Sequence, residues 1–258
     1  MQYFKTGLPL TMALFFSFGV FAQQLEVGLN VGGASYLGDL NQYNPVKISG
    51  LSGGVFAKVN FNPHLGVGVH YNFGRVAADD AKSDYEQFRD RNLKFVTPLH
   101  EISFLLDFNL FDLTAYNRST RFTPYLFVGF GTVIFNPRTT YNGKTYKLRE
   151  LTTEGQAHTY KNYALTFPYG AGVKYKLKNN WTIFSQIGYR SPQTDYIDDV
   201  SGVYPDEPGF LSDRSGETTN VYLGTPGTQR GDFRKRDNYM FVGIGISYTF
   251  VSQKCFTF

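Results

Sequence analysis

The sequence contains one cysteine, a small excess of positive charge and no apolar run of membrane-helix length. Cys255 has no partner among the 258 residues, which excludes an intramolecular disulfide as a source of stability. The formal charge is only +4, and Lys and Arg are scattered among acidic residues, which argues against a nucleic-acid-binding surface. The apolar run at residues 7–21 is shorter than the roughly 20 residues that an α-helix needs to cross a bilayer.

The first 22 residues have the pattern of a secretory signal peptide. Lys5 supplies a positive charge, residues 7–21 are apolar, and Ala22 is a small residue of the kind found beside a cleavage site. We therefore predict that residues 1–22 are removed on export. The remaining residues, 23–258, show no break between two cores, so we predict a single domain.

Motifs for catalysis and for metal or cofactor binding are also missing. His and Cys do not occur at metal-ligand spacings, and no glycine-rich phosphate loop precedes a helix. The acidic run 195–199 has the clustered carboxylates that suit a divalent cation, but no cation-loop pattern surrounds it, and we favour a solvent-exposed loop. We expect no catalytic residues, no metal site and no cofactor, and hence a protein that is not an enzyme.

Aromatic residues and glycine are abundant. Aromatic residues make up 17% of the chain and glycine accounts for 27 residues, yet the mean hydropathy is −0.27, a mixture that fits strands with one apolar and one polar face. Residues 165–177 show this pattern most clearly, with apolar side chains at every second position from Leu165 to Leu177. A period of two over this length predicts a strand long enough to span a membrane, which takes about 9–11 residues.

Eight such segments predict an all-β fold, an eight-stranded antiparallel transmembrane β-barrel. They lie at residues 25–31, 55–61, 65–74, 101–108, 121–135, 165–177, 181–190 and 239–250. Their connections alternate in length, as in barrels with short periplasmic turns and long extracellular loops. The turns lie at 62–63, 111–120 and 178–180, and the loops at 38–50, 75–96, 136–162 and 192–237. Both ends of the mature chain are then expected in the periplasm, and outer-membrane lipid around the barrel.

The predicted barrel has charged residues on its inner face. An eight-stranded interior is just wide enough for side chains to fill it. The alternation places four cations and three anions there, namely Glu26, Lys58, Glu101, Asp107, Lys174, Lys176 and Arg190. Because a buried charge is tolerated only when it is paired and hydrogen-bonded, we predict a salt-bridged plug in the lumen and not an open channel.

Several phrases, taken in order, go beyond the general composition of a barrel. They are Gly33–Leu40, Phe135–Pro137, Thr153–Gln156, Pro168–Lys176 and Gly188–Arg190 followed by Thr194–Val200. Together they resemble the PorG-like barrels of Bacteroidetes over essentially the whole mature chain. The resemblance implies an outer-membrane component of the type IX secretion machinery that contacts a periplasmic ring of PorK and PorN. It implies a structural role and carries over no catalytic residue.

If that role holds, the periplasmic end has to present a docking site. We predict it in the turn 111–120, which carries Phe111, Leu113, Tyr116 and Arg118, and in the tail 251–258. Three other functions stay open from the sequence. These are a surface adhesin or evasion barrel working through residues 192–237, a lipid-modifying barrel enzyme, and a small solute channel.

Overall fold

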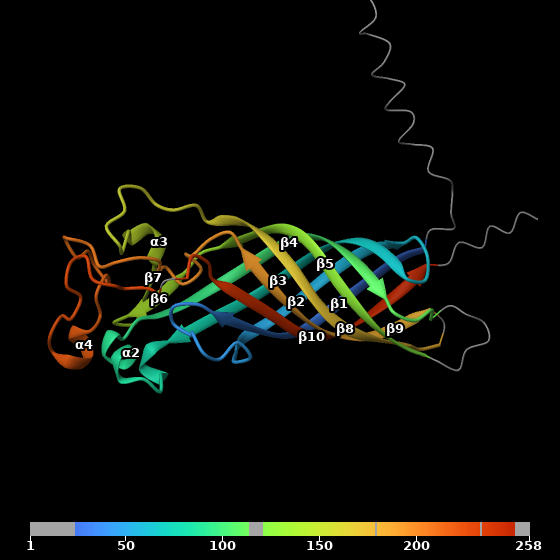
Figure 1. Cartoon of the computed structure of the whole chain (residues 1–258), viewed down its shortest axis with the longest axis horizontal. Coiled ribbons are helices and arrows are strands. Elements are labelled where there is room, and N and C mark those ends of the chain that lie inside the picture. Colours follow the sequence, from blue (N-terminus) through green and yellow to red (C-terminus); the bar gives the residue numbers. More distant parts are fainter. Residues whose placement is uncertain (1–23, 114–120, 179, 233, 251–258) are drawn as a thin grey trace, which may run out of the picture.

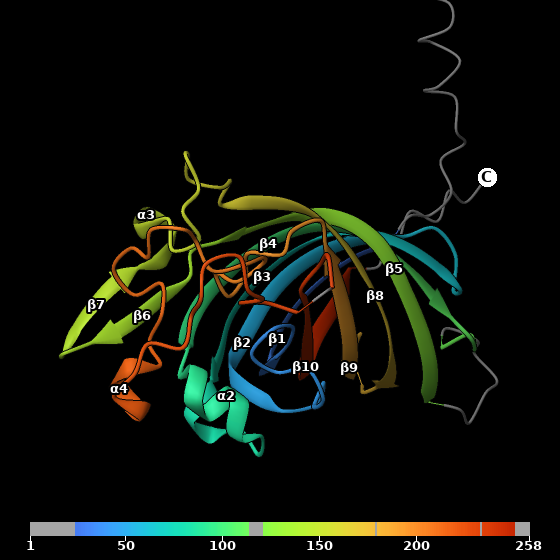
Figure 2. The same cartoon turned by 60° about the vertical axis from the view of Figure 1, so that its left-hand side comes forward.

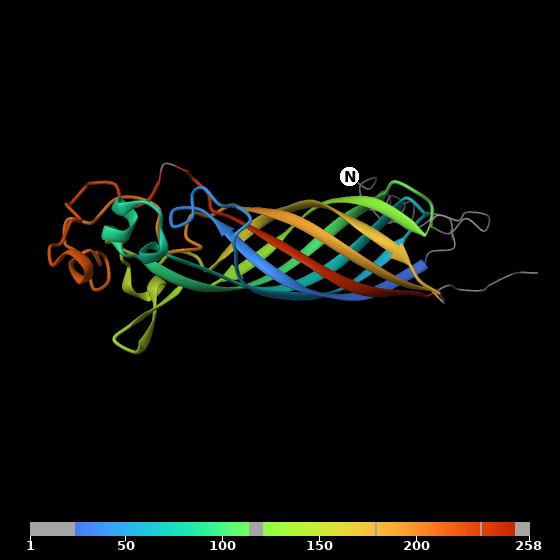
Figure 3. The ribbon, with the colours of Figure 1, turned by 90° about the horizontal axis from the view of Figure 1, so that it is seen from below.

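The structure is a computed structural model that describes residues 24–113, 121–178, 180–232 and 234–250. The predicted signal peptide, residues 1–22, and the tail 251–258 lie outside the described residues. Eight long antiparallel strands run side by side around a barrel (Figures 1 and 3). They are β1 (Gln24–Leu37), β2 (Ile48–Asn60), β3 (Leu65–Asp79), β4 (Lys94–Asn109), β5 (Phe122–Phe135), β8 (Tyr163–Lys176), β9 (Trp181–Pro192) and β10 (Asn238–Phe250).

The barrel closes on itself through the pairing of its strands. Around the barrel the order is β1-β2-β3-β4-β5-β8-β9-β10, and β10 pairs with β1 again. Closure leaves no free edge, so the strands satisfy one another's N–H and C=O groups, as hydrocarbon surroundings require. The predicted eight-stranded antiparallel barrel is therefore confirmed. No helix in the described part of the chain is long and apolar enough to cross a membrane.

The two faces of each strand lie in different surroundings. In β3, for example, Val67, Val69, Tyr71 and Phe73 are exposed on the outside, whereas the residues between them are buried in the lumen. Some lumen positions are glycine because large rings occupy the space beside them. A Cβ added at Gly28 would lie 2.5 Å from the Phe56 ring, and one at Gly245 would clash with the Phe184 ring. Small residues on the inner face thus make room for aromatic ones.

The two ends of the barrel differ. We call the end with the short connections the turn end, and the end with the connections 38–47, 80–93, 136–162 and 193–237 the loop end, which is at the left in Figure 1. The loop end contains the short elements η1 (Asp80–Lys82), α2 (Glu86–Arg91), β6 (Arg138–Tyr141), β7 (Lys144–Lys147), α3 (Leu148–Leu151) and α4 (Gly216–Thr219). Figure 2 shows the β6–β7 hairpin extending away from the barrel. Its turn, Asn142-Gly143, has both residues at positive φ, as a tight hairpin turn requires.

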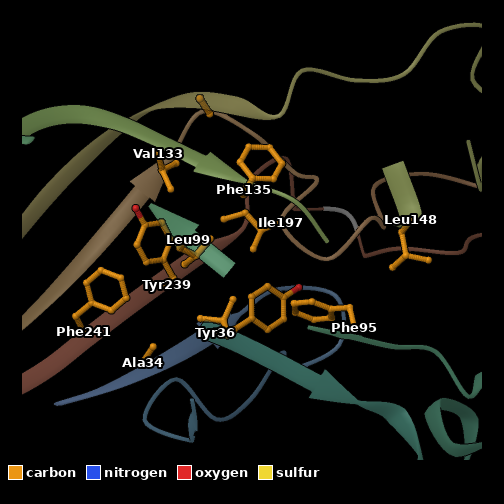
Figure 4. Packing of buried hydrophobic residues seen from close by; sticks show 12 residues of the cluster. Ala34, Tyr36, Phe95, Leu99, Val133, Phe135, Leu148, Ile197, Tyr239 and Phe241 are labelled. Atoms are coloured by element: carbon orange, nitrogen blue, oxygen red, sulfur yellow. The ribbon is translucent and has the colours of Figure 1, made fainter. Parts of the chain in front are cut away.

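Apolar side chains close the loop end from inside (Figure 4). The cluster joins barrel residues such as Tyr36, Leu99 and Phe135 to Ile197, which comes from the connection 193–237 and is fully buried. The Tyr36 and Phe95 rings meet edge to face with their centroids 4.9 Å apart. The long connections therefore fold over the barrel mouth.

Candidate functional site

The lumen holds two separate groups of paired charges. In the group nearer the turn end, the Lys58 ammonium lies 3.3 Å from Glu26 and 2.8 Å from Asp107, and the Lys174 ammonium lies 3.2 Å from Asp107. Lys174 also donates a hydrogen bond to the Asn109 side-chain oxygen at 2.8 Å. All four charged side chains are buried, so this layer blocks the lumen with two cations and two anions.

An aromatic layer separates the two charged groups. The Phe56 ring stacks on His70 at 4.9 Å and meets Phe184 edge to face at 5.7 Å. Lys174 lies 4.0 Å from the centroid of the Tyr125 ring. The space left between these side chains is a cavity of about 10 Å³, which is at the lower limit for holding one water molecule. The described side chains of this layer thus leave little room for water in this part of the lumen.

The second charged group lies nearer the loop end. The Arg190 Nε lies 3.2 Å from a Glu101 carboxylate oxygen, to which the Tyr239 hydroxyl also donates at 2.7 Å. Ser103 donates to the other carboxylate oxygen at 3.1 Å. The guanidinium lies 4.5 Å from the centroid of the Phe241 ring, and Arg190 is only 1% exposed. The pair is thus fully desolvated and hydrogen-bonded.

The structure places six of the seven predicted lumen charges inside the barrel, but in two groups and not in one network. The seventh, Lys176, belongs to neither. It lies two residues closer to the turn end than Lys174, and its ammonium donates to the Leu113 carbonyl oxygen at 3.2 Å. Lys176 lines the vestibule at the turn end together with Glu26 and Lys174 of the first group, and it forms no ion pair with a carboxylate among the described residues.

That vestibule has a volume of about 560 Å³. Amide and hydroxyl side chains line much of it, including those of Gln24, Asn60, Asn109 and Thr182. Of the predicted docking residues, Leu113 lines the vestibule and Phe111 is exposed beside it. Tyr116 and Arg118 lie outside the described residues. The turn end therefore combines a polar hollow with an apolar rim.

A polar cap covers the loop end, and its carboxylates are mostly buried. The Tyr36 hydroxyl donates to both Asp198 and Asp237, and Asp199 accepts hydrogen bonds from Thr153 and from Tyr160. The expectation of a solvent-exposed acidic loop at 195–199 is thus wrong for Asp198 and Asp199. Their carboxylates are buried because the loops fold onto one another and supply donors. Periodicity gives no signal for such contacts between long loops.

Two arginines tie the loops of the cap together. Arg230 lies 3.0 Å from Glu154 and donates to the carbonyl oxygens of Asp199 and Ser212 at 2.8 and 3.1 Å. Arg91 pairs with Asp80 at 2.7 Å and donates to the Asp39 carbonyl oxygen at 3.1 Å. Arg91 thus links the connections 80–93 and 38–47, and Arg230 links the connections 193–237 and 136–162.

One group of cap carboxylates has the donor set of a cation site. Oxygen atoms of Asp39, Asp195 and Asp237 all lie within 4.8 Å of one another, and oxygen ligands suit hard divalent ions. Burial raises the pKa of Asp39 to about 7 and that of Asp195 to about 6. Burial likewise raises the pKa of Asp199 to about 6, against the lowering effect of Arg230. Protonation therefore relieves part of the repulsion among these groups near neutral pH.

These shifts predict how the stability of the cap depends on pH. Between the ordinary Asp pKa of 3.8 and about 7, the folded cap binds more protons than the unfolded one, so its free energy of unfolding falls as pH rises through that window. We expect residues 193–237 to be cut more slowly at pH 5 than at pH 8 by a protease that is active at both. Asp39→Asn should weaken this dependence. Faster cutting at pH 5 would show that the cap carboxylates are ionised in the folded state.

These features define a small membrane-spanning β-barrel, with an apolar outer face, a filled charged interior and capped loops. Residues 5–258 match the model of the family described as "Domain of unknown function (DUF6089)". The chain belongs to this family. No curated protein matches the chain.

Solved structures of small outer-membrane proteins are similar to the chain. The N-terminal barrel domain of OprF from Pseudomonas aeruginosa is 10% identical, with 89% of this chain and 98% of that chain covered and a TM-score of 0.39. Ail from Yersinia pestis is 11% identical, with 88% and 99% covered and a TM-score of 0.42. A major outer membrane protein from Thermus thermophilus is 13% identical, with 89% and 100% covered and a TM-score of 0.43.

Proposed function

We propose that this chain is a non-enzymatic barrel of the bacterial outer membrane that serves as a structural anchor of a type IX secretion machinery. In this proposal the signal peptide at 1–22 is cleaved, the loop end faces the cell exterior, and the turn end faces the periplasm. PorK-like and PorN-like ring proteins contact the turn end. The resemblance of the ordered sequence phrases to PorG-like barrels supports the choice of this machinery.

The blocked lumen is the observation that carries the proposal. Two buried charged groups and an aromatic layer fill the described interior, so the protein has to act through its surfaces and not through a pore. The same charges stand where a lipid-modifying enzyme would need a slot for an acyl chain, which is why we propose no enzymatic activity. Anchoring needs only a barrel fixed by its lipid-facing strands and a docking surface at one end.

The turn end offers such a docking surface. Leu110 and Phe111 are exposed side by side beyond the end of β4, and the Phe111 N–H donates to the Thr123 hydroxyl at 2.8 Å, which holds this segment against β5. Lys176 adds a positive charge in the adjoining vestibule. An apolar pair beside a polar hollow has the mixed character of a protein-docking site.

The proposal predicts which variant loses the ring. We expect mild-detergent purification of the tagged protein from native membranes to recover PorK-like and PorN-like proteins, identified by mass spectrometry. Phe111→Asp should lower this recovery about tenfold or more, because loss of a central apolar contact costs roughly 2 kcal/mol or more. Tyr222→Asp, at the loop end, is the matched control and should not change it. A barrel that purifies alone while the ring stays intact would contradict the proposal.

A surface-binding barrel is the second candidate, and one feature favours it. Val221, Tyr222 and Leu223 are exposed together in the longest connection, and Tyr222 is 78% exposed. Exposed apolar groups at a loop tip are typical of interaction sites. Under this alternative Tyr222→Asp would abolish attachment to a surface ligand, and Phe111→Asp would leave it unchanged, which is the opposite of the pattern that the anchor requires.

A further inference from the structure

A second concave site lies at the loop end, apart from both the lumen and the turn-end vestibule. It is a groove of about 120 Å³ between the connection 38–47 and the segment 79–88. Its walls carry two tyrosines, two lysines, two aspartates and several amides, namely Tyr43, Tyr85, Lys47, Lys82, Asp79, Asp84, Asn41, Gln42 and Asn44. A groove of this size accepts a ring-sized ligand and not a folded partner.

Two exposed aromatic rings form one side of the groove. The Tyr43 and Tyr85 ring centroids are 5.1 Å apart at an interplanar angle of 43°, and the two side chains are 66% and 47% exposed. Neither hydroxyl has a hydrogen-bond partner within the described part of the chain. Open aromatic faces of this kind stack on the C–H face of a sugar ring, since the negative face of the ring attracts polarised C–H groups.

Lipid tails do not cover these rings. Phe73 lies in the aromatic band where the outer bilayer interface is expected, and Asp79 ends β3 six residues further on. At about 3.3 Å per residue and a strand tilt of about 40°, the groove lies roughly 15 Å above that band. The polar layer of a bilayer leaflet is only roughly 5–8 Å thick. The groove therefore lies in the aqueous layer, where surface sugars occur.

Several polar groups of the groove have no partner among the described residues, and its charged groups are balanced. Lys47, Lys82 and Asp84 form no ion pair among the described residues, and the side-chain amides of Gln42 and Asn44 are not hydrogen-bonded there either. Two ammonium and two carboxylate groups together favour an uncharged ligand with many hydroxyls over a polyanion. Arg91, which holds the Asp39 carbonyl oxygen and the Asp80 carboxylate, fixes the two walls relative to each other.

From this geometry we infer that the groove is a binding site for an uncharged hexose unit of a cell-surface glycan. Tyr43 and Tyr85 stack on the sugar ring, and Lys82, Asp84 and the amides bind its hydroxyls. The site shares with the anchor proposal only the orientation in which the loop end faces the cell exterior. It lies at the opposite end of the barrel from the docking surface, so either test can fail without the other.

The test uses the full-length protein in nanodiscs and saturation-transfer difference NMR with the methyl glycosides of glucose, galactose, mannose and N-acetylglucosamine. We expect transfer to the ring protons of at least one glycoside. Tyr43→Ala should weaken its binding roughly three- to tenfold, which corresponds to the loss of one aromatic contact. Tyr43→Phe should keep binding, because stacking needs the ring and not the hydroxyl, and Tyr222→Ala should keep it as well.

Three outcomes would overturn the inference. The first is no transfer to any of the four glycosides, and the second is binding that survives Tyr43→Ala combined with Tyr85→Ala. The third is binding only of sulfated or phosphorylated sugars that disappears at high salt, because that would assign the lysines to an anion. All the substituted tyrosines are exposed, and the folded barrel is checked by its heat-dependent gel mobility.

Discussion

Glu101→Ala is expected to lower the free energy of unfolding by about 3–5 kcal/mol, because it leaves the Arg190 guanidinium buried without a carboxylate. The Tyr239 hydroxyl loses its acceptor at the same time. The measurement is urea unfolding in lipid vesicles, followed by the fluorescence of Trp181. Trp181 is the only tryptophan and lies on the outer face of β9, so its emission reports the transfer between lipid and water.

Two controls separate the loss of a buried pair from a general effect of charge. Replacing both Glu101 and Arg190 by Met should restore much of the stability, since no unpaired charge then remains in the lumen. Removing the pair Lys147–Glu150, whose side chains are 50% and 59% exposed, should cost less than about 1 kcal/mol. A loss below about 1 kcal/mol for Glu101→Ala would show that the lumen is hydrated at this level.

Arg230→Ala is expected to open the cap without unfolding the barrel. The change leaves the buried Glu154 carboxylate without a cation, although the Ser201 and Gly202 N–H groups still donate to it, and it leaves the carbonyl oxygens of Asp199 and Ser212 without the Arg230 donor. The cost, about 3–5 kcal/mol, falls on the loops. The strands keep their own hydrogen bonds. We therefore expect rapid proteolysis within 193–237 when protease is added outside intact cells, while the heat-dependent gel mobility of the barrel stays unchanged.

Arg234→Ala is the matched control for this experiment. Arg234 lies in the same connection, but its side chain is half exposed and its one ion pair, with Asp232, is long at 3.5 Å. Its removal should leave the rate of proteolysis close to that of the wild type. Equal protease resistance of Arg230→Ala and wild type would mean that other contacts hold the cap.

The barrel strands were predictable because lipid and lumen impose a period of two on every residue that crosses the bilayer. The segment predicted at 165–177 corresponds to β8, Tyr163–Lys176. Beyond the bilayer this constraint ends. β3 continues to Asp79 and β4 begins at Lys94, in stretches that the sequence favoured as loop. The two strands go on pairing there because Val76 and Phe95 are buried in the apolar cluster under the cap, and no lipid-facing alternation is needed. The β6–β7 hairpin was also missed, although Asn142-Gly143 is a strong turn signal.

The candidate sites were predictable only in part. Alternation predicts which side chains point into the lumen, as it does for Lys58 and Asp107. It does not predict which of them meet, because their heights along the barrel depend on how the strands are staggered. Lys176 shows this, since it points inward but lies in the vestibule. The cap depends on contacts between loops far apart in sequence, such as Tyr36 with Asp198, for which a single sequence offers no periodic signal.

The most direct test of the account is the electrical conductance of the purified wild-type protein in planar lipid bilayers. The central claim is that paired charges and aromatic rings block the lumen, so that the protein acts through its two ends. The account predicts insertion without conductance steps, with insertion verified by the fluorescence of Trp181. Stable and reproducible steps from the folded wild-type barrel would contradict it and would favour the solute channel.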